Sequence, residues 1–355
     1  MIKYIGSKRR LVPVLSAIAA ASGARSALDL FTGTTRVAQA FKQQGLAVSA
    51  VDTARYAEVF ARCYIETDAA SVDHPALRDA IAYLDGLGGR AGYVTETFCV
   101  RSRFFQPFNG ERIDAVRDAI EAEFAGSPLY PVLLTSLIEA ADRVDSTTGL
   151  QMAYVKRWAP RSFAPLRLRV PELLVGSGSA IRADAARVGA TLGHFDLAYL
   201  DPPYNQHRYF TNYHVWETLV AWDAPEHYGV ACKRIDARAD HTKSVFNSKR
   251  TMIPALTALV RELSCELMML SYNDESWLSL DALVEMCGHH EAVRTLGLPS
   301  ARYVGARIGI HNPAGQRVGT VSHLHNTEYL VVAGARGPVA RATAALEAVG
   351  LAPTG

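Results

Sequence analysis

Several features that classify a protein at once are missing from this chain of 355 residues. No apolar run approaches the roughly 20 residues that a membrane span needs, and the opening MIKYIGSKRR lacks the apolar core of a signal peptide. The five cysteines are scattered without metal-ligand spacing, which favours reduced, buried thiols over a metal site or disulfides. These absences predict a cytoplasmic protein with no membrane partner and no metal.

A large excess of charge of one sign is also missing, because the formal net charge is only +2. Basic residues nevertheless gather in three segments that contain no acid. They are KRWAPRSFAPLRLR at 156–169, HTKSVFNSKR at 241–250 and the N-terminal MIKYIGSKRR. Any one such run is ordinarily a solvated face, but three of them interleaved with aromatic residues favour a polyanion as partner.

The start of the chain has the pattern of a strand–helix–strand unit. A helix is expected at 11–21, ending near Gly23, and a short apolar strand at 26–31. The turn TGTTR then leads into a helix at 37–45 and a second strand at 46–52, which ends on an acid. Strands joined in this way are typical of a parallel sheet.

The rest of the chain divides into a helical part and a second set of strands. From about 55 to 170 helical patterns dominate without alternating strands, which predicts an inserted helical domain. A long polar segment is expected at 205–250. The remaining expected elements are strands at 179–184, 195–200 and 266–274, a helix near 251–264, and β segments in ARYVGARIGIHN (301–312) and NTEYLVVAG (326–334).

The stretch DLFTGTTRVA places an acid and a glycine at the end of the first strand. Gly33 lets the backbone approach a ligand, and the helix start that follows can face an anion. A dehydrogenase is disfavoured, because the second close-approach glycine of G-x-G-x-x-G is missing. One glycine beside Asp29 suits a smaller, neutral or cationic ligand. Asp52, about 20 residues on, can accept hydrogen bonds from ribose hydroxyls.

The stretch YLDPPYNQHRYF ends an apolar strand with an acid, two prolines and an aromatic residue. Proline cannot donate to a sheet ladder, so the strand should stop at Pro202 and present Asp201 at its carboxyl end, where ligands bind. An exocyclic amine of a nucleobase has a delocalised lone pair, which is freed when both N–H groups are accepted. Asp201 and the Pro202 carbonyl supply two acceptors. Pro203 stiffens that unit, and Tyr204 offers a stacking ring. The alternative is a simple turn.

The motif Asp-Pro-Pro-Tyr resembles the signature of the amino-group DNA methyltransferases. KYIGSKRRL resembles their first cofactor motif, and LDLFTGTTRVA resembles the D-x-F-x-G motif that follows it. The order of these motifs, with a long insertion before D-P-P-Y, is similar to that of the Dam-type adenine methylases. FFQPFNGERIDAVRDAIE, FNSK and LSYND also resemble recurring pieces of this family, and the resemblance runs from Ile2 to about Gly334.

This resemblance implies a doubly wound, Rossmann-like α/β methyltransferase sheet with a reversed C-terminal β segment and an inserted, mostly helical domain. Residues 1–67 and 171–340 would form the methyltransferase domain. Residues 68–170 would help to read the DNA sequence, and 341–355 would be a C-terminal tail. The implied cofactor is S-adenosyl-L-methionine. The implied substrate is double-stranded DNA, from which the target base is flipped out of the stack.

The resemblance also implies a set of site residues. Tyr4, Gly6 and Lys8 match the N-terminal motif, with Lys8 near the methionine carboxylate of the cofactor. The remaining cofactor-binding positions are Asp29, Phe31, Thr32, Gly33 and Thr34 around the methionine moiety, Asp52 at the ribose and Asp184 near the cofactor adenine. The catalytic positions are Asp201, Pro202, Pro203 and Tyr204. TGTTR departs from the commoner G-x-G turn, which affects the expected contacts of Thr34.

The implied activity is methyl transfer to N6 of adenine. The same chemistry serves any aromatic exocyclic amine, so cytosine N4 stays open, as do RNA or protein methylation and a non-catalytic DNA-binding module. Intact Lys8, Asp29, Asp52, Asp201 and Tyr204 favour an active enzyme. Both action alone and action beside a cognate restriction endonuclease are compatible with the sequence. Ser271–Asn273 closes a strand beside the expected site and either shapes the base pocket or caps the strand.

Overall fold

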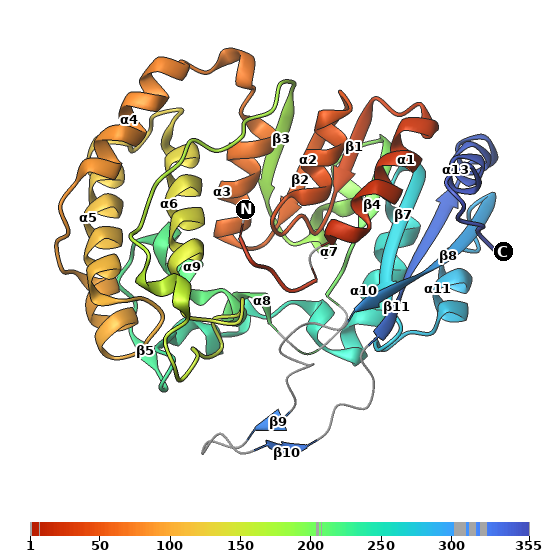
Figure 1. Cartoon of the computed structure of the whole chain (residues 1–355). Coiled ribbons are helices and arrows are strands. Elements are labelled where there is room, and N and C mark those ends of the chain that lie inside the picture. The colour runs from red at the N-terminus through yellow and green to blue at the C-terminus, as the bar shows by residue number, and fades with distance from the viewer. Residues whose placement is uncertain are drawn as a thin grey trace.

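The computed structural model of the chain contains one seven-stranded sheet flanked by helices (Figure 1). The described residues are 2–6, 8–203, 206, 208–301, 310–311, 317–319 and 325–354. The strands lie in the order β3-β2-β1-β4-β7-β11-β8. Their bounds are β1 Ser26–Asp29, β2 Ala47–Asp52, β3 Gly178–Arg182, β4 Phe195–Leu200, β7 Cys265–Asn273, β8 Ala292–Ala301 and β11 His325–Gly334.

The sheet is mostly parallel, with a reversed strand near its C-terminal edge. β3, β2, β1, β4 and β7 pair in parallel, whereas β11 pairs antiparallel with both β7 and β8. The order of the strands reverses between β1 and β4, so a topological switch point lies between them. The expected Rossmann-like sheet with a reversed C-terminal segment is therefore confirmed.

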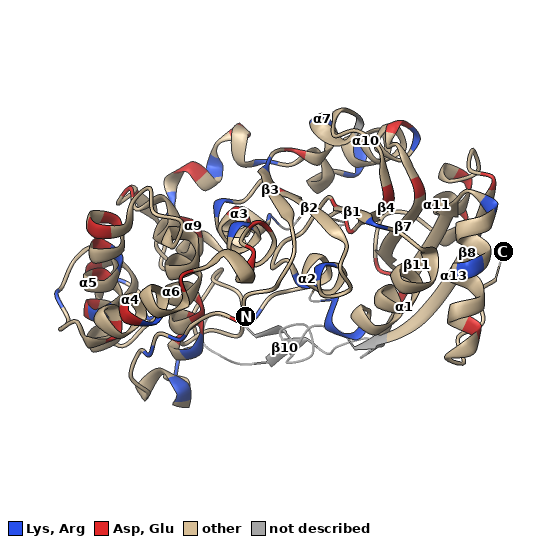
Figure 2. Cartoon of the chain, turned by 90° about the horizontal axis from the view of Figure 1, so that it is seen from above, with Lys and Arg blue, Asp and Glu red and all other residues tan. Residues whose placement is uncertain are grey.

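Helices cover both faces of the sheet, as the view from above shows (Figure 2). One layer contains α1 (Val12–Ser22), α2 (Arg36–Gln43) and α13 (Arg336–Ala348), and the other contains α7 (Ala185–Val188), α10 (Lys249–Glu262) and α11 (Leu280–Met286). The side chains of β4 alternate between the two layers: Leu197 and Tyr199 pack in the first core, Ala198 and Leu200 in the second. α1 ends at Gly23, which has a φ of 73°.

The insertion is helical, as predicted, up to residue 144. It contains α4 (His74–Gly86), the π-helical η4 (Thr95–Val100), α5 (Pro107–Phe124) and α6 (Tyr130–Val144). α6 packs against α3 (Arg55–Ala61) and α9 (His214–Ala221) of the main domain. From 145 to 177 the described backbone is irregular apart from the short 3-10 turn η5 (Pro160–Phe163).

The prediction of a long polar segment at 205–250 is wrong in its middle. The structure forms α8 (Tyr209–Asn212), α9, and a hairpin of β5 (His227–Tyr228) and β6 (Lys233–Arg234). Three 3-10 turns follow: η7 (Ile235–Arg238), η8 (Asp240–Thr242) and η9 (Val245–Asn247). α9 buries Val215, Trp216 and Leu219 and packs on α3 and α6. Because the composition of residues 205–250 as a whole is polar, the sequence pattern did not indicate this short amphipathic helix.

Other differences lie at the C-terminal end. α11 and β8 were not expected, and ARYVGARIGIHN falls mostly outside the described residues apart from β9 (Ile310–His311), which pairs with β10 (Arg317–Gly319). The expected tail from 341 is wrong, because α13 continues to Ala348 and packs on α1. Within the described ranges, no helix is long and apolar enough to cross a membrane.

Candidate active site

A cavity of about 490 Å³ opens at the carboxyl edge of the parallel strands. Its wall contains residues that follow four neighbouring strands: Phe31 after β1, Asp52 at the end of β2, Asp184 after β3 and Asp201 after β4. Both its size and its place at the switch point are those of a small-molecule site in an α/β protein. The sheet topology thus gathers acids that lie far apart in the sequence.

The N-terminal segment forms one side of this cavity. The ring of Tyr4 stacks on those of Tyr213 and Tyr209, with centroids 4.5 Å and 5.5 Å away. Its hydroxyl lies 3.1 Å from that of Tyr56. Gly33 has a φ of 52°, and a Cβ added there would lie 3.1 Å from the Tyr4 ring. The turn after β1 therefore needs glycine both for its conformation and for this close packing.

Asp52 organises the same turn through its side chain. Its two carboxylate oxygens accept from the backbone N–H groups of Gly33 and Ala54, at 2.9 Å and 3.0 Å. Burial raises the pKa of Asp52, although these two donors oppose the shift. The carboxylate lines the cavity, and each oxygen keeps acceptor capacity for a ligand hydroxyl.

Asp29 is a buried acid whose two carboxylate oxygens are not both hydrogen-bonded. Oδ2 accepts from the Thr32 hydroxyl at 2.9 Å, whereas Oδ1 has no hydrogen-bond partner among the described residues. Burial raises the pKa of Asp29 to about 7, with further contributions from the charges of Asp201 and Asp52. A buried carboxylate in this state fits the ammonium group of a cationic ligand, which would supply the missing partner.

The departure TGTTR keeps the backbone of a glycine-rich turn. Thr35, which stands where the second glycine of G-x-G would be, has a φ of 60° and is fully buried. Its hydroxyl donates to the Thr34 carbonyl and accepts from Gln39 Nε2. These contacts hold a β-branched residue in a conformation that ordinarily favours glycine.

Asp201 lies at the other end of the cavity wall, beyond the last residue of β4. Lys8 Nζ is 2.9 Å from its Oδ1, and the Ser271 hydroxyl donates to the same oxygen at 3.0 Å. Lys8 also lies 2.6 Å from Glu328 Oε1. Burial raises the pKa of Asp201, and the Lys8 ammonium opposes this shift. In this structure Lys8 therefore contacts the D-P-P-Y acid, whereas the resemblance implied a position near the methionine carboxylate of the cofactor.

The structure brings half of the expected residues to the wall of one cavity. Tyr4, Gly6, Phe31, Asp52, Asp184, Asp201 and Pro203 line it. Lys8, Asp29, Thr32, Gly33, Thr34 and Pro202 are buried next to these residues in the chain but are not part of the lining. Tyr204 lies outside the described residues. Asp184 additionally caps α7, because its Oδ1 accepts from Ala186 N at 3.0 Å.

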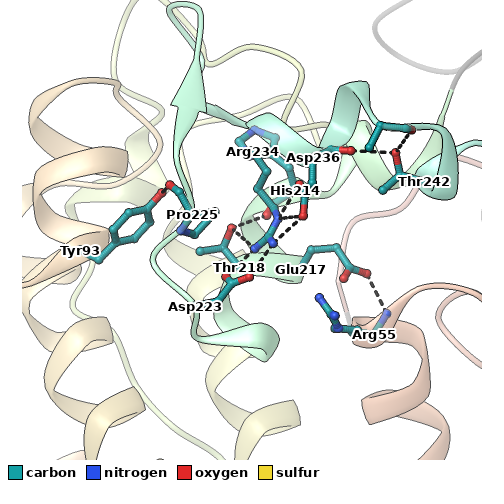
Figure 3. A network of polar contacts seen from close by, with 11 residues as sticks. Arg55, Tyr93, His214, Glu217, Thr218, Asp223, Pro225, Arg234, Asp236 and Thr242 are labelled. Atoms are coloured by element: carbon teal, nitrogen blue, oxygen red, sulfur yellow. Dashed lines mark hydrogen bonds and ion pairs between the residues drawn. The ribbon is translucent and has the colours of Figure 1, made fainter.

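Sequence reasoning missed the wall supplied by α9 and by the 3-10 turns after it. Glu217 is buried and accepts from Arg55 N at 2.8 Å, and burial raises its pKa to about 7. Arg234 is also buried and pairs with both Asp223 and Asp236 (Figure 3). This pairing ties the end of α9 to the segment that carries Asp236, His241, Lys243, Phe246 and Asn247 into the cavity lining. The basic run at 241–250 was the one sequence signal for this wall.

The described residues contain no group of three or more His, Cys, Asp or Glu side chains that could hold a metal ion.

Comparisons with known proteins agree with this geometry. Residues 4–286 match the family model of D12 class N6 adenine-specific DNA methyltransferases. The Type II methyltransferase M.NlaIII of Neisseria lactamica is 30% identical over 83% of this chain and 91% of its own length. Modification methylase StsI of Streptococcus sanguinis is 28% identical and M.FokI of Planomicrobium okeanokoites 25%, over 80% and 85% of this chain. The chain spans about half the length of these two, 46% and 50%. The family model covers most of the chain, and the D-P-P-Y acid lies in the wall of a cavity at the switch point. This protein therefore belongs to the D12 class of N6 adenine-specific DNA methyltransferases.

Proposed function

We propose that the cavity at the carboxyl edge of the sheet brings S-adenosyl-L-methionine and a flipped adenine of duplex DNA together for direct methyl transfer to N6. The observation that carries this proposal is that Asp201 shares one cavity with Phe31, Asp52 and Asp184. The amine-binding acid and these three cofactor-binding positions therefore line the same space. No covalent enzyme intermediate is needed, because the amine attacks the methyl group directly.

The cofactor would lie along the ends of β1, β2 and β3. Asp52 would accept hydrogen bonds from the ribose hydroxyls, since it lines the cavity at the end of β2 and each of its oxygens can accept a further bond. Phe31, packed edge-on against Phe246 at 5.1 Å, would contact the apolar part of the ligand. Asp29 is buried next to the lining residue Phe31 rather than in the lining itself, and its Oδ1, which has no partner among the described residues, is the oxygen that we assign to the methionine ammonium. When bound, this cofactor supplies an electrophilic methyl group on a sulfonium.

The target amine would lie beside Asp201. Lys8 and Ser271 both contact Oδ1, so Oδ2 is the oxygen that we assign to the amine. The Pro202 carbonyl would accept the second N–H, and Tyr204 would stack on the base. Tyr209 and Phe210, which line the cavity from α8, would form further walls of the base pocket. Accepting both hydrogens localises the nitrogen lone pair and orients it towards the methyl group.

The helical insertion would help to hold the DNA, as the position of its last loop supports. Gln151 N donates to the Asn212 carbonyl, and Gln151 Oε1 accepts from Val215 N at 2.9 Å, so this loop is fixed to α8 and α9. The same loop then exposes Lys156 and Arg157. These cations would contact DNA phosphates beside the mouth of the cavity, since phosphate contacts position a protein on its duplex.

A companion restriction endonuclease is part of the proposal, on the basis of the relatives named above. They are called Type II methyltransferases or modification methylases. Methylation of the recognition sequence by this enzyme would then protect it from the nuclease. A strain that carries the gene should show DNA resistant to one Type II nuclease, and deletion of the gene should remove that resistance.

The central test is transfer of a labelled methyl group from S-adenosylmethionine to plasmid DNA, followed by nucleoside analysis. The expected product is N6-methyladenine. N4-methylcytosine would overturn the base assignment, and absence of label in DNA would overturn the substrate. Asp201→Ala should abolish transfer while cofactor affinity and folding are retained. Full activity of that variant would overturn the role assigned to Asp201.

A further inference from the structure

Three charged side chains form a buried cluster at the amine end of the cavity, and one of them, Glu328, belongs to no motif of the sequence. Lys8 Nζ bridges Asp201 Oδ1 at 2.9 Å and Glu328 Oε1 at 2.6 Å. The exposed fractions of these side chains are 8% for Lys8, 10% for Glu328 and 19% for Asp201. Two carboxylates thus share one ammonium, so the three groups together carry one negative charge.

The register of the sheet explains why Glu328 lies here. β4 and β7 pair in parallel with Leu200 beside Leu270, so the next residues, Asp201 and Ser271, are level with each other. β11 runs antiparallel to β7 and places Glu328 beside Asn273, whose Nδ2 lies 3.5 Å from Glu328 Oε2. The polar residues continue, on the same face of the sheet, the apolar rows of the core beneath α1.

We propose that Glu328 is a positioning residue for methyl transfer, which holds Lys8 against Asp201 and keeps the amine end of the cavity negatively charged. This inference rests on the role proposed above for Asp201. The N6 lone pair forms the bond to the methyl carbon, the electron pair of the C–S bond stays on sulfur, and N6 later releases a proton to water. Positive charge therefore moves from sulfur to N6 during the reaction.

A negative cluster beside N6 stabilises this movement of charge, because it lies closer to the nitrogen than to the sulfonium. Without the charge of Glu328, the Lys8 ammonium would cancel that of Asp201, and the amine end would be neutral. The isosteric variant Glu328→Gln should therefore lower kcat by about ten- to a hundredfold. The Kd for S-adenosylmethionine, measured by titration of the folded enzyme, should stay within about twofold of the wild-type value.

The pH profile separates this role from a merely structural one. Among the described residues, the groups that face Asp201 are Lys8 from η1 (Lys8–Arg10), Glu328 from β11, Ser271 from β7, Tyr199 from β4 and Asp29 from β1. The Glu328 charge raises the pKa of Asp201, whereas the Lys8 ammonium lowers it. Because Asp201 must be ionised to accept the amine, Glu328→Gln should move the acid limb of the kcat profile to lower pH. Lys8→Met should move it to higher pH.

Glu266→Gln is the matched control, because it removes the same charge from the opposite end of β7, where the side chain is 51% exposed. Its kcat and acid limb should equal those of the wild type. If Glu328→Gln does not fold, as judged by circular dichroism, Glu328→Asp tests the same point, because it retains the charge. A wild-type acid limb in Glu328→Asp supports the inference, and a limb displaced by about one pH unit or more overturns it.

Two results with Glu328→Gln would overturn the inference: a kcat equal to that of Glu266→Gln, or an acid limb that moves in the same direction as in Lys8→Met. Failure of the proposed function is recognised separately, because Asp201→Ala would then keep full activity. If Asp201→Ala is inactive and Glu328→Gln is normal, only the role of Glu328 is lost.

Discussion

Replacing Asp29 with asparagine should stabilise the protein at high pH while it weakens the cofactor site. Burial raises the pKa of this acid from 3.8 to about 7. The native state therefore binds the Asp29 proton more tightly than the unfolded chain does. Each tenfold change in proton affinity corresponds to about 1.4 kcal/mol, so the ionised carboxylate costs the cofactor-free native state about 4 kcal/mol above pH 7. The cost is absent below about pH 4 and grows between pH 4 and 7.

Asp29→Asn removes this pH-dependent cost and adds a smaller, constant one. The amide oxygen can still accept from the Thr32 hydroxyl, as Oδ2 does in the wild type. The amide N–H group replaces Oδ1, which has no partner among the described residues, and leaving it unsatisfied costs about 1–3 kcal/mol. The variant should therefore be less stable than the wild type near pH 4.5 and more stable, by about 1–3 kcal/mol, at pH 8.

Urea unfolding of both proteins without cofactor, at several pH values between 4.5 and 8, measures this difference. Other titrating groups are common to both chains, so they cancel in the difference between the two free energies of unfolding. A difference that does not change with pH, or that favours the wild type more as pH rises, would refute the reasoning. With S-adenosylmethionine at about 100 times its Kd, the wild type should gain about 2.7 kcal/mol. The variant should gain much less, because the ammonium loses its carboxylate.

Three further predictions concern other parts of the molecule. Gly33→Ala should lower stability by about 1–2 kcal/mol and raise the Kd for the cofactor, because φ is 52° there and the new Cβ meets the Tyr4 ring. Thermal unfolding and cofactor titration measure the two effects, and an unchanged Kd would contradict the prediction. The double variant Lys156→Ala, Arg157→Ala should weaken DNA binding and reduce the slope of log Kd against log salt by about 2. The control Arg25→Ala, which lies before β1 at the opposite edge of the sheet, should leave both the Kd and this slope unchanged. Arg117→Met should lower the free energy of unfolding by about 1–3 kcal/mol, because this buried guanidinium bonds the Leu219 and Val220 carbonyls of α9 from α5; equal urea midpoints would refute it.

The sequence by itself determined the local elements and the order of the motifs. Hydrophobic periodicity and Gly23 set the bounds of α1 to within about one residue, and the apolar run before Pro202 placed the end of β4. Acids that directly follow strands, such as Asp52 and Asp201, could be assigned to one edge, because parallel strands end at the same edge of a sheet. These features depend on residues that are close in the chain.

The tertiary structure decided which distant residues share the site. Glu328 contacts Lys8 across 320 positions, and this contact depends on the antiparallel register of β11 on β7, which no local pattern specifies. Glu217 reached the cavity only because α9 packs on α3 and α6, a consequence of which apolar faces are buried together. The contact of Lys8 with Asp201 has the same origin, because Lys8 bridges Asp201 and Glu328, and these two carboxylates lie together only through the register of β11 on β7.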